Sequence, residues 1–312
     1  MTSDTPISVL IAAHARPEML ARTLSSLADA DQVSRVDQVV VVENGGQQQL
    51  DAVVDGFSDR LPVRYDRIAN ANKSMALNHG LDLIAGGLVI LLDDDILVDS
   101  GLIRAYLHAM TEYPKGAFFG GPITVDYETP PETSLLPFMT ASTKGWSLGV
   151  RDRWLGLYTA FLGFNWAAYH NDLMEIGGFD PFHGPGSAGG LTGQESDAQR
   201  RLMARGIRGR YVAAATVSHH VSASQIDPDW IVSRRERAGR ELARFVDKTL
   251  PRWLPEPIGR MGVRGAILIQ RLRFLLGNGF SPNRELSRRW WQAYRRGALY
   301  EWSSCSGGEF RI

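Results

Sequence analysis

The chain has 312 residues, of which 44 % are hydrophobic and 22 % charged, and it carries 34 Lys+Arg against 34 Asp+Glu. This composition is typical of a globular protein that buries a large core. Its single cysteine, Cys305, excludes an internal disulfide and favours a reducing compartment. No apolar run approaches the ~18 residues that span a bilayer, and Met1 to Leu20 lacks the basic start of a signal peptide. We therefore expect a cytoplasmic protein.

The zero net charge hides an uneven distribution along the chain. Residues 230–312 hold 17 Lys+Arg and 7 Asp+Glu, a balance of +10, so the preceding residues carry a balance of −10. This contrast predicts two parts, a main domain over residues 1–225 and an arginine-rich helical extension over residues 226–312. The acidic main domain gives no support to nucleic-acid binding, because phosphate contacts need a basic face.

The first hundred residues alternate between strand-like and helix-like periodicity. Strands are expected at 7–12, 38–42, 63–65 and 89–92, and helices at 17–27, 51–57 and 74–84. Repeated βα units of this length predict an α/β fold with a parallel sheet and helices on both faces. Further along, we expect a strand at 211–217 and helices at 230–249, 262–276 and 284–300.

Short segments that carry polar residues follow three of the predicted strands. The segments are Ala13-His14, Glu43-Asn44 and the triplet Asp93 to Asp95. Because the carboxyl ends of parallel strands meet at one edge of a sheet, these segments are expected to line one crevice.

The acidic triplet is the most informative of these segments. Three adjacent carboxylates repel one another and raise one another's pKa. A hard divalent cation such as Mg²⁺ or Mn²⁺, carrying a diphosphate, would relieve that cost. The alternative is a solvated acidic turn before a helix N-terminus, which also favours Asp.

Several segments, in this order along the chain, resemble the family 2 glycosyltransferases. They are residues 7–16, residues 40–45, residues 72–80, the triplet 93–95, residues 165–180 and residues 193–197. The resemblance covers about residues 6 to 222. Two positions depart from the family pattern, since Glu43 replaces an Asp and Leu77 replaces an Arg.

The resemblance implies a GT-A fold, with a Rossmann-like, mostly parallel sheet, and transfer of a sugar with inversion from a nucleotide-diphospho sugar. UDP is the expected nucleotide. It implies Asp95 as the metal ligand, with Asp93 at the metal or the ribose. Asp94 is expected to face solvent or a helix N-terminus. The residues expected to line the donor pocket are Ala13, Arg16, Glu43, Lys73, Asp93 and Asp94.

The same resemblance implies the remaining catalytic groups. Glu195 is expected to act as the base on the acceptor hydroxyl, and Asp197 to pair with Arg201 on a helix surface. His219 or His220 would supply a further metal ligand, and we favour His219. Asn165 and Trp166 are expected to face the acceptor, with a place in the core as the alternative for Trp166.

Two further segments allow more than one interpretation. The glycine-rich residues 183–190 suggest a lid over the bound donor, or a surface loop without a role. Residues 288–296 mix arginines with aromatics, which suits a helix lying on anionic lipid at the inner membrane face. The alternative, which we favour, is a helical subdomain that packs its aromatics and forms a dimer contact.

The acceptor is expected to be a glycan, a lipid-linked molecule or a small natural product. Two other functions compete with transfer. One is an inactive nucleotide-sugar-binding or scaffold protein of the same fold. The other is a sugar-phosphate nucleotidyltransferase, but residues 12–17 lack the glycine-rich, basic loop that such an enzyme shows after its first strand.

Overall fold

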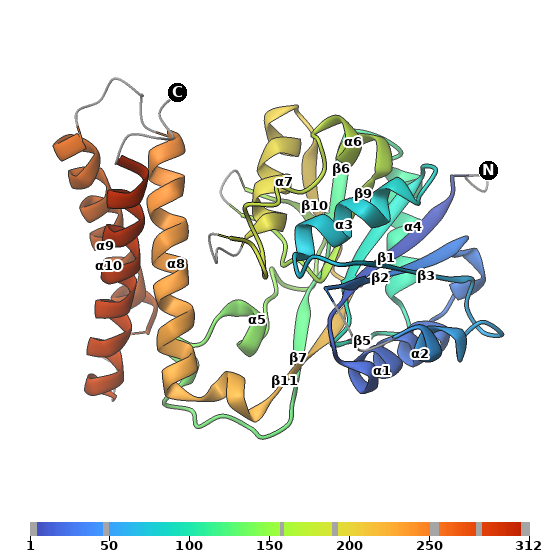
Figure 1. Cartoon of the computed structure of the whole chain (residues 1–312), viewed down its shortest axis with the longest axis horizontal. Coiled ribbons are helices and arrows are strands. Elements are labelled where there is room, and N and C mark those ends of the chain that lie inside the picture. Colours follow the sequence, from blue (N-terminus) through green and yellow to red (C-terminus); the bar gives the residue numbers. More distant parts are fainter. Residues whose placement is uncertain are drawn as a thin grey trace. The chain divides into compact units, whose positions relative to one another are not determined.

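A computed structural model of the chain describes residues 5–45, 50–156, 159–188, 193–249, 256–278 and 283–306. Figure 1 shows strands enclosed by helices, followed by three long helices near the C-terminus. The described residues divide into two compact units. The first comprises residues up to Asp126 together with Lys144–His220, and the second comprises Tyr127–Thr143 and the chain from Val221 onward.

The main sheet has eight strands in the order β3-β2-β1-β4-β9-β6-β10-β8. Its strands are β1 (Ile7–Ala13), β2 (Gln38–Asn44), β3 (Val63–Ile68), β4 (Leu88–Asp93), β6 (Ala117–Gly120), β8 (Arg153–Trp154), β9 (Asn165–Tyr169) and β10 (Arg208–Tyr211). The four strands from β3 to β4 are mutually parallel, and β9 runs antiparallel between β4 and β6. A smaller sheet has the order β5-β11-β7, with β5 (Ile96–Val98), β7 (Ile123–Tyr127) and β11 (Val217–Val221).

The helices connect the strands and form the C-terminal region. They are α1 (Pro17–Ala28), α2 (Asp51–Asp55), α3 (Lys73–Asp82), α4 (Leu102–Glu112), α5 (Ala141–Lys144), α6 (His170–Glu175), α7 (Gln194–Ala204), α8 (Pro228–Thr249), α9 (Glu256–Asn278) and α10 (Arg284–Ser306). Short 3₁₀ turns lie at Val33–Arg35, Leu136–Phe138 and Ala223–Ile226. None of the helices in the described ranges is both long enough and apolar enough to cross a membrane.

The elements expected in the first hundred residues are confirmed, with small differences at their ends. The expected strand at 211–217 is wrong. Strand β10 ends at Tyr211, the chain turns, and β11 begins only at Val217 in the other sheet. Residues 212–216, Val-Ala-Ala-Ala-Thr, continue the apolar pattern of the flanking residues, so this pattern alone does not reveal the break between the strands.

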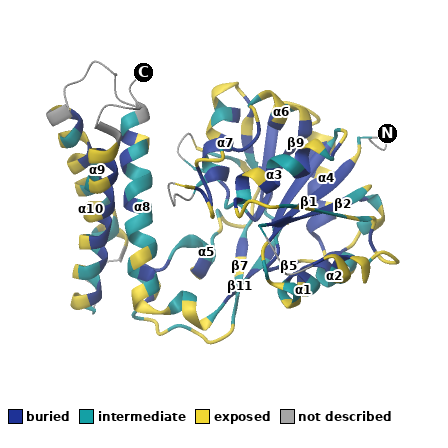
Figure 2. Ribbon diagram, in the orientation of Figure 1, coloured by how far each residue is buried: buried dark blue, intermediate teal, exposed yellow. Residues whose placement is uncertain are grey.

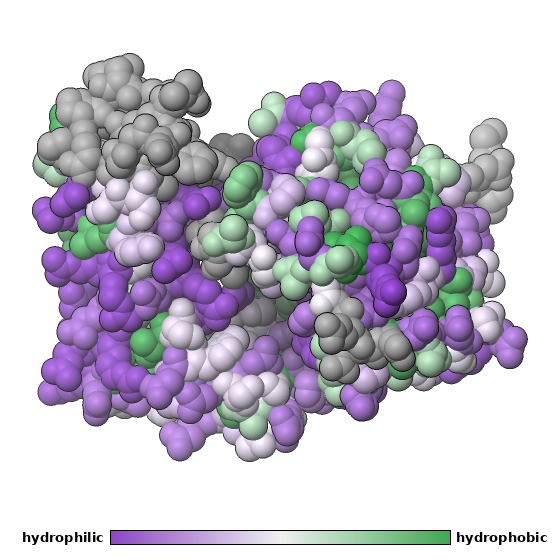
Figure 3. Space-filling view, in the orientation of Figure 1, coloured by the Kyte–Doolittle hydropathy of each residue, from purple (hydrophilic) through white to green (hydrophobic). Residues whose placement is uncertain are grey.

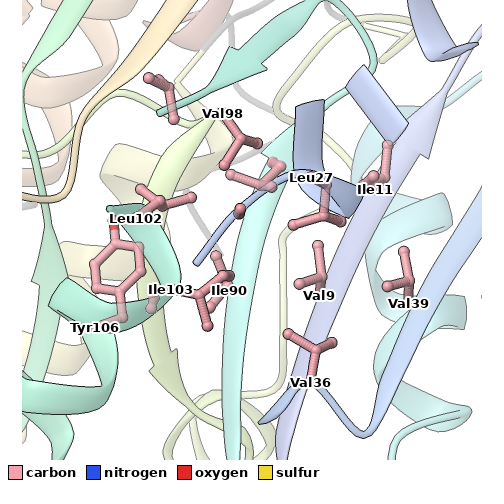
Figure 4. Packing of buried hydrophobic residues seen from close by; sticks show 14 of the residues in the cluster. Val9, Ile11, Leu27, Val36, Val39, Ile90, Val98, Leu102, Ile103 and Tyr106 are labelled. Carbon is pink, nitrogen blue, oxygen red and sulfur yellow. The ribbon is translucent and has the colours of Figure 1, made fainter. Parts of the chain in front are cut away.

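The core of the first unit lies on both faces of the central strands. Along β1, Val9 and Ile11 belong to one buried cluster and Leu10 and Ala12 to another, because successive side chains point to opposite faces. Figure 4 shows Val9, Ile11 and Ile90 with the side chains that pack near them. The central strands are accordingly buried along their length (Figure 2), as expected for parallel strands covered on both faces.

The second unit is built from α8, α9 and α10, which pack on one another. Helices α8 and α10 approach closely because glycines face the neighbouring backbone. A Cβ atom on Gly239 would lie 2.2 Å from the carbonyl oxygen of Tyr294, and one on Gly297 would lie 2.0 Å from that of Glu236.

The aromatic residues of α10 pack inside this helical unit. Trp290 and Tyr294 are buried, and the guanidinium of Arg235 from α8 lies 3.8 Å and 3.7 Å from their ring centroids. Burial among these rings lowers the pKa of Arg235 to about 10. The lipid-facing interpretation of residues 288–296 is therefore wrong for the aromatics, which belong to the packed interior of the second unit.

Helix α7 is held in the first unit by the guanidinium of Arg201. Its Nε donates to Asp197 at 2.8 Å, confirming the predicted i,i+4 pair. Its other nitrogens donate to the backbone oxygens of Ile176 at 2.5 Å and Gly178 at 2.7 Å. One half-buried side chain thus connects α7 to the turn after α6.

We predict that Arg201→Met lowers the free energy of unfolding by about 2 kcal/mol, because charged donors to two backbone oxygens are lost. The matched control is Arg205→Met, which breaks an exposed pair with Glu175 and should cost less than about 1 kcal/mol. Urea denaturation of both variants measures the difference. Equal midpoints for the two variants would contradict the role given to Arg201.

Candidate active site

The carboxyl ends of three neighbouring strands meet at one edge of the main sheet. Ala12 of β1 pairs with Asp93 of β4, and Ala13 pairs with Glu43 of β2. The three segments expected to share one crevice are therefore adjacent in space, as the parallel arrangement requires.

A cavity of about 550 Å³ opens at this edge. Its lining residues are Ala12, His14, Ala15, Arg16, Asn44, Ala71, Lys73, Asp93, Asp94, Pro185 and Gly186. The turn that follows β1 contributes three of them, and its central residue, Ala15, has a φ of 50°. A positive φ is uncommon for a residue other than glycine, so the turn holds a specific shape that presents His14 and Arg16.

Each carboxylate of the acidic triplet has a cationic or hydrogen-bonding partner. Asp93 accepts from Lys73 Nζ at 2.5 Å. Asp94 accepts from the backbone amide of His14 at 2.9 Å and pairs with Arg16. Asp95 accepts from Arg16 Nη1 at 2.6 Å. The repulsion expected among the three carboxylates is thus offset by two side-chain cations of the same cavity.

The expectation that Asp94 faces solvent or a helix N-terminus is wrong. Its residue is 1 % exposed. The side chain turns toward β1 because the His14 amide and the Arg16 guanidinium offer it partners there. Burial raises the pKa of Asp94 to about 6, against the opposing charge of Arg16.

Asp95 lies in a different electrostatic environment from Asp94. Burial alone would raise its pKa, but the interaction with His219 and the guanidinium of Arg16 together hold that pKa below its usual range. Its Oδ2 is 3.7 Å from His219 Nε2. Its Oδ1 is buried and has no hydrogen-bond partner within the described part of the chain.

The two candidate histidines point to opposite faces of strand β11. His219 is buried, stacks on the ring of Phe164 at a centroid distance of 4.5 Å, and faces Asp95. His220 points to the opposite face of the strand, where its Nδ1 lies 3.2 Å from Asp126. Alternation along a strand therefore places His219 at the site and His220 away from it.

These residues fit a divalent cation that is shared with a substrate. Asp95 and His219 offer oxygen and nitrogen donors, and the partnerless Oδ1 is the kind of buried atom that such an ion would satisfy. Across the described ranges, no group of three or more His, Cys, Asp or Glu side chains is arranged to hold a metal by itself. Mg²⁺-type ions commonly take one or two protein ligands and complete their shell with substrate phosphates and water.

Glu195 lies in the first turn of α7, next to the acidic triplet. Its Oε1 is 3.3 Å from Lys73 Nζ and accepts from Gln194 Nε2 at 2.6 Å. A Cβ atom on Gly163 would lie 1.9 Å from the same oxygen, so only glycine leaves room for this carboxylate. Burial raises the pKa of Glu195, and the Lys73 charge opposes that rise.

Lys73 connects the two acidic groups because it opens helix α3. The side chain of Asn72 caps that helix by accepting from the Met75 amide at 3.0 Å. The Lys73 ammonium lies between Asp93 and Glu195. Burial disfavours the charge of Lys73, but these two carboxylates raise its pKa above the usual value.

The described part of the predicted lid is anchored to the N-terminal end of α3. Ser74 Oγ donates to the backbone oxygen of His183 at 2.7 Å, and the Lys73 amide donates to that of Pro185 at 3.1 Å. A Cβ atom on Gly186 would lie 1.6 Å from the Ala71 oxygen. Within residues 183–188, Pro185 and Gly186 form part of the cavity wall, and movement of this segment as a lid stays a prediction. The predicted lid residues Gly189 and Gly190 lie outside the described residues.

Four predicted contacts are not found at the cavity. Ala13 is buried in the core, while its neighbours Ala12 and His14 line the cavity. Glu43 is buried and accepts from Tyr65 Oη and from the Leu50 amide at 3.2 Å. In both cases the strand pleat directs the side chain to the other face of the sheet.

The other two contacts are those expected for the acceptor. Asn165 is buried and accepts from Tyr106 Oη at 2.7 Å. Trp166 is 0 % exposed and packs in the core. Neither residue faces the cavity. Trp166 takes the alternative place in the core, and Asn165 makes a buried hydrogen bond.

Two polar residues of the cavity lining, His14 and Asn44, lie in segments expected at this crevice but were not among the predicted donor-pocket residues. Asn44 follows the predicted Glu43, and His14 follows the predicted Ala13. The ring Nδ1 of His14 lies 2.6 Å from the backbone oxygen of Asn44. Their polar character next to two strand ends is the sequence signal that could have identified them.

The fold and this cavity define a sugar-transferring enzyme of the GT-A type. The family model described as "Glycosyltransferase like family 2" matches residues 5–240. The chain belongs to this family and is a glycosyltransferase.

Three known proteins resemble the chain. Glucosyl-dolichyl phosphate glucuronosyltransferase of Haloferax volcanii is 23 % identical over 236 residues, which cover 73 % of each protein. The mannosyltransferase PcManGT of Pyrobaculum calidifontis, solved with GDP-Man and Mn²⁺, has a TM-score of 0.59 at 15 % identity, covering 96 % of this chain and 88 % of that one. S. aureus TarS 1-349 has a TM-score of 0.55 at 13 % identity, covering 96 % and 82 %. The two structural similarities show a shared fold.

We predict that Arg16→Leu lowers the free energy of unfolding by about 2 kcal/mol, because it leaves the buried Asp94 with one amide partner. The double variant Arg16→Leu/Asp94→Asn should recover part of that loss, since Asp94 then carries no buried charge while Asp95 still lacks its contact with Arg16. Chemical denaturation at neutral pH without added metal measures both. As a control, Arg22→Leu breaks an exposed pair with Asp126 and should cost less than about 1 kcal/mol. A double variant no more stable than Arg16→Leu would contradict the pairing.

Proposed function

We propose that this glycosyltransferase moves a sugar from a nucleotide-diphospho sugar, with UDP as the favoured nucleotide, to an acceptor hydroxyl with inversion at the anomeric carbon. The observation that carries the proposal is the position of Lys73 between Asp93 and Glu195. Lys73 thus lies between two groups. Asp93 belongs to an acidic strand end that is suited to a cation-bound diphosphate, and Glu195 is a buried carboxylate that is suited to proton removal. The groups for both chemical requirements of glycosyl transfer thereby lie around one lysine of the cavity lining.

The nucleotide would bind along the turn after β1 and the end of β2. His14 and Asn44 line that part of the cavity and offer hydrogen bonds to a base or ribose. Arg16 and Lys73 are the two side-chain cations of the cavity lining, and they would contact the diphosphate. Asp93 would lie within reach of the ribose or of the bound cation's water shell.

We assign the divalent cation, Mn²⁺ or Mg²⁺, to Asp95 and His219. When bound, it would neutralise the charge that develops on the departing nucleoside diphosphate. The partnerless Oδ1 of Asp95 supports this assignment, as does the presence of Mn²⁺ in the complex of the structurally similar PcManGT.

Glu195 would act as the general base. Its carboxylate takes the proton of the acceptor hydroxyl as that oxygen bonds to the anomeric carbon. The bond from this carbon to the diphosphate oxygen breaks in the same step, and the electron pair leaves with the nucleoside diphosphate. Attack from the side opposite the leaving group inverts the anomeric centre.

The acceptor that we favour is a lipid-linked sugar. The Haloferax volcanii relative is named for transfer to a glucosyl-dolichyl phosphate, and its coverage includes most of this chain. Free glycans and small natural products are the other acceptor classes. We place the reaction in residues 1–225. We also place the enzyme at the cytoplasmic side of a membrane. That it forms a homodimer stays a prediction.

The donor assignment is tested by thermal shift and calorimetry with UDP-, GDP- and dTDP-sugars, each with Mn²⁺, Mg²⁺ or EDTA. One nucleotide should stabilise the protein only with a cation, and Asp95→Ala should abolish this effect. Asp126→Ala, which removes a carboxylate on the His220 side of β11, is the matched control and should retain it. A folded protein that no donor stabilises would contradict the proposal and favour the inactive scaffold alternative.

Loss of the base should reduce turnover without loss of donor binding. We expect Glu195→Gln to lower kcat by about 10²–10⁴-fold while the donor-induced thermal shift stays unchanged. An assay of nucleoside diphosphate release, run with the identified donor and acceptor, measures kcat. A kcat within a few-fold of the unchanged enzyme would contradict the role of Glu195.

The dependence of kcat on pH follows from the surroundings of Glu195. The group must be deprotonated to accept a proton, and burial raises its pKa, so kcat should fall on the acidic side at a higher pH than for an exposed carboxylate. Lys73→Met removes the charge that lowers this pKa and should move the acidic limb to still higher pH. Lys115→Met, at an exposed lysine, is the control. An unmoved or downward-shifted limb in Lys73→Met would contradict the coupling of the two groups.

A further inference from the structure

Helix α9 has two apolar faces, and only one of them packs within the second unit. On the packed face, Val263 is fully buried, and Ala266 and Ile267 contact the same cluster from α8 and α10. Phe274 packs against Trp290 with the two rings tilted and their centroids 5.1 Å apart. This face explains how the helix is held and accounts for about half of its apolar residues.

The second face, which we call the outer α9 face, is exposed. Its members are Ile258, Met261, Leu268, Ile269, Leu272 and Leu276. Their exposed fractions run from 49 % for Ile258 to 88 % for Leu276. At 3.6 residues per turn they occupy an arc of roughly 100° on the side opposite Val263. Figure 2 shows exposed segments along α9, and Figure 3 shows hydrophobic atoms that interrupt the hydrophilic surface of the C-terminal helices.

Exposed arginines flank the outer α9 face. Arg264 and Arg271 lie along one side and Arg273 along the other, by the same helical geometry. None of the three has a carboxylate partner among the residues that the structure describes. Glu256 is the single acidic residue in the sequence of the helix.

Three arginines of the neighbouring helices differ in this respect. Arg244 pairs with Glu301 at 2.5 Å, Arg296 pairs with Glu236 at 2.5 Å, and Arg289 pairs with Asp229. The unit therefore satisfies arginines of α8 and α10 internally and leaves three on α9 available for an external anion.

We propose that the outer α9 face docks on an anionic lipid surface. An exposed apolar stripe bordered by arginines matches the interface between acyl chains and negatively charged headgroups. Each arginine near such a surface adds to the electrostatic attraction, while its aliphatic stem extends over the apolar stripe and its guanidinium reaches the headgroups. A protein partner of the same face would need carboxylates for three guanidinium groups, and Asp and Glu are depleted at protein interfaces.

This surface differs from the one that sequence patterning favours. Residues 288–296 combine arginines and tryptophans, but the aromatics are packed inside the unit and Arg289 and Arg296 are paired. The lipid contact therefore moves from α10 to α9. It does not depend on the transfer reaction, so the two proposals can fail separately.

The experiment is flotation of the full chain with vesicles of phosphatidylcholine alone or with about one third phosphatidylglycerol added. The unchanged protein should float with the anionic vesicles, and high salt should release it. Leu268→Gln/Leu272→Gln should bind about tenfold more weakly, because two apolar side chains leave the interface. Arg264→Gln/Arg271→Gln should lose binding to the anionic vesicles and its salt dependence. Val150→Gln, at a valine 93 % exposed in the first unit, is the control and should bind normally.

Several outcomes would overturn the proposal. They are failure of the unchanged protein to float, equal flotation of the leucine variant, and equal binding to neutral and anionic vesicles. Light scattering after size-exclusion chromatography tests whether the outer α9 face instead joins two copies of the chain. A dimer that becomes monomeric in Leu268→Gln/Leu272→Gln would make the outer α9 face a contact between two copies of the chain, which also overturns lipid docking.

Discussion

Three carboxylates at the end of one buried strand set the main physical constraint on this enzyme. Asp93, Asp94 and Asp95 follow β4 directly, and like charges at that spacing are unfavourable unless cations or amides accompany them. The protein supplies Arg16 from the turn after β1 and Lys73 from the first turn of α3. The position of each surrounding element can be understood from this requirement.

The neutralising groups are also the ones that a diphosphate would attract. In the free protein Arg16 serves Asp94 and Asp95, while Lys73 serves Asp93 and Glu195. Binding of a donor with its cation would add both negative and positive charge at the same place. The carboxylates would then keep a counter-ion while the side-chain cations turn partly toward phosphate. Addition of a donor diphosphate together with a divalent cation would thus leave the net charge of the cluster unchanged.

Sequence patterns were sufficient for the parallel half of the sheet and for the convergence of the strand ends. The resemblance to the family implied Arg16, Lys73, Asp93 and Glu195, which the structure brings together. Sequence patterns failed where one residue of register decides the face of a strand. Ala13 and Glu43 point into the core while His14 and Asn44 line the cavity, and β11 turns His219 toward Asp95 and His220 away. Adjacent residues share the same local sequence, so only the observed register shows which of them points to the cavity and which to the other face of the sheet.

Other failures arose where tertiary contacts decide between two uses of the same residues. Gly184 and Gly186 suggest mobility by composition, but both are also needed because neighbouring atoms come too close for a Cβ atom. Trp166 and the aromatics of α10 suit a binding surface equally well, and packing buries them. The outer α9 face shows the reverse case, an apolar stripe that the structure leaves exposed.

A Mn²⁺ titration followed by electron paramagnetic resonance would test whether the acidic strand end binds a cation together with a nucleotide. The free-ion signal should fall when the protein and UDP are both present, with one equivalent of Mn²⁺ bound for each chain. Asp95→Asn should leave the free-ion signal intact, whereas Asp126→Asn should behave like the unchanged protein. Equal Mn²⁺ binding by Asp95→Asn and the unchanged protein, or no binding by either with a range of nucleoside diphosphates, would contradict the assignment of the site.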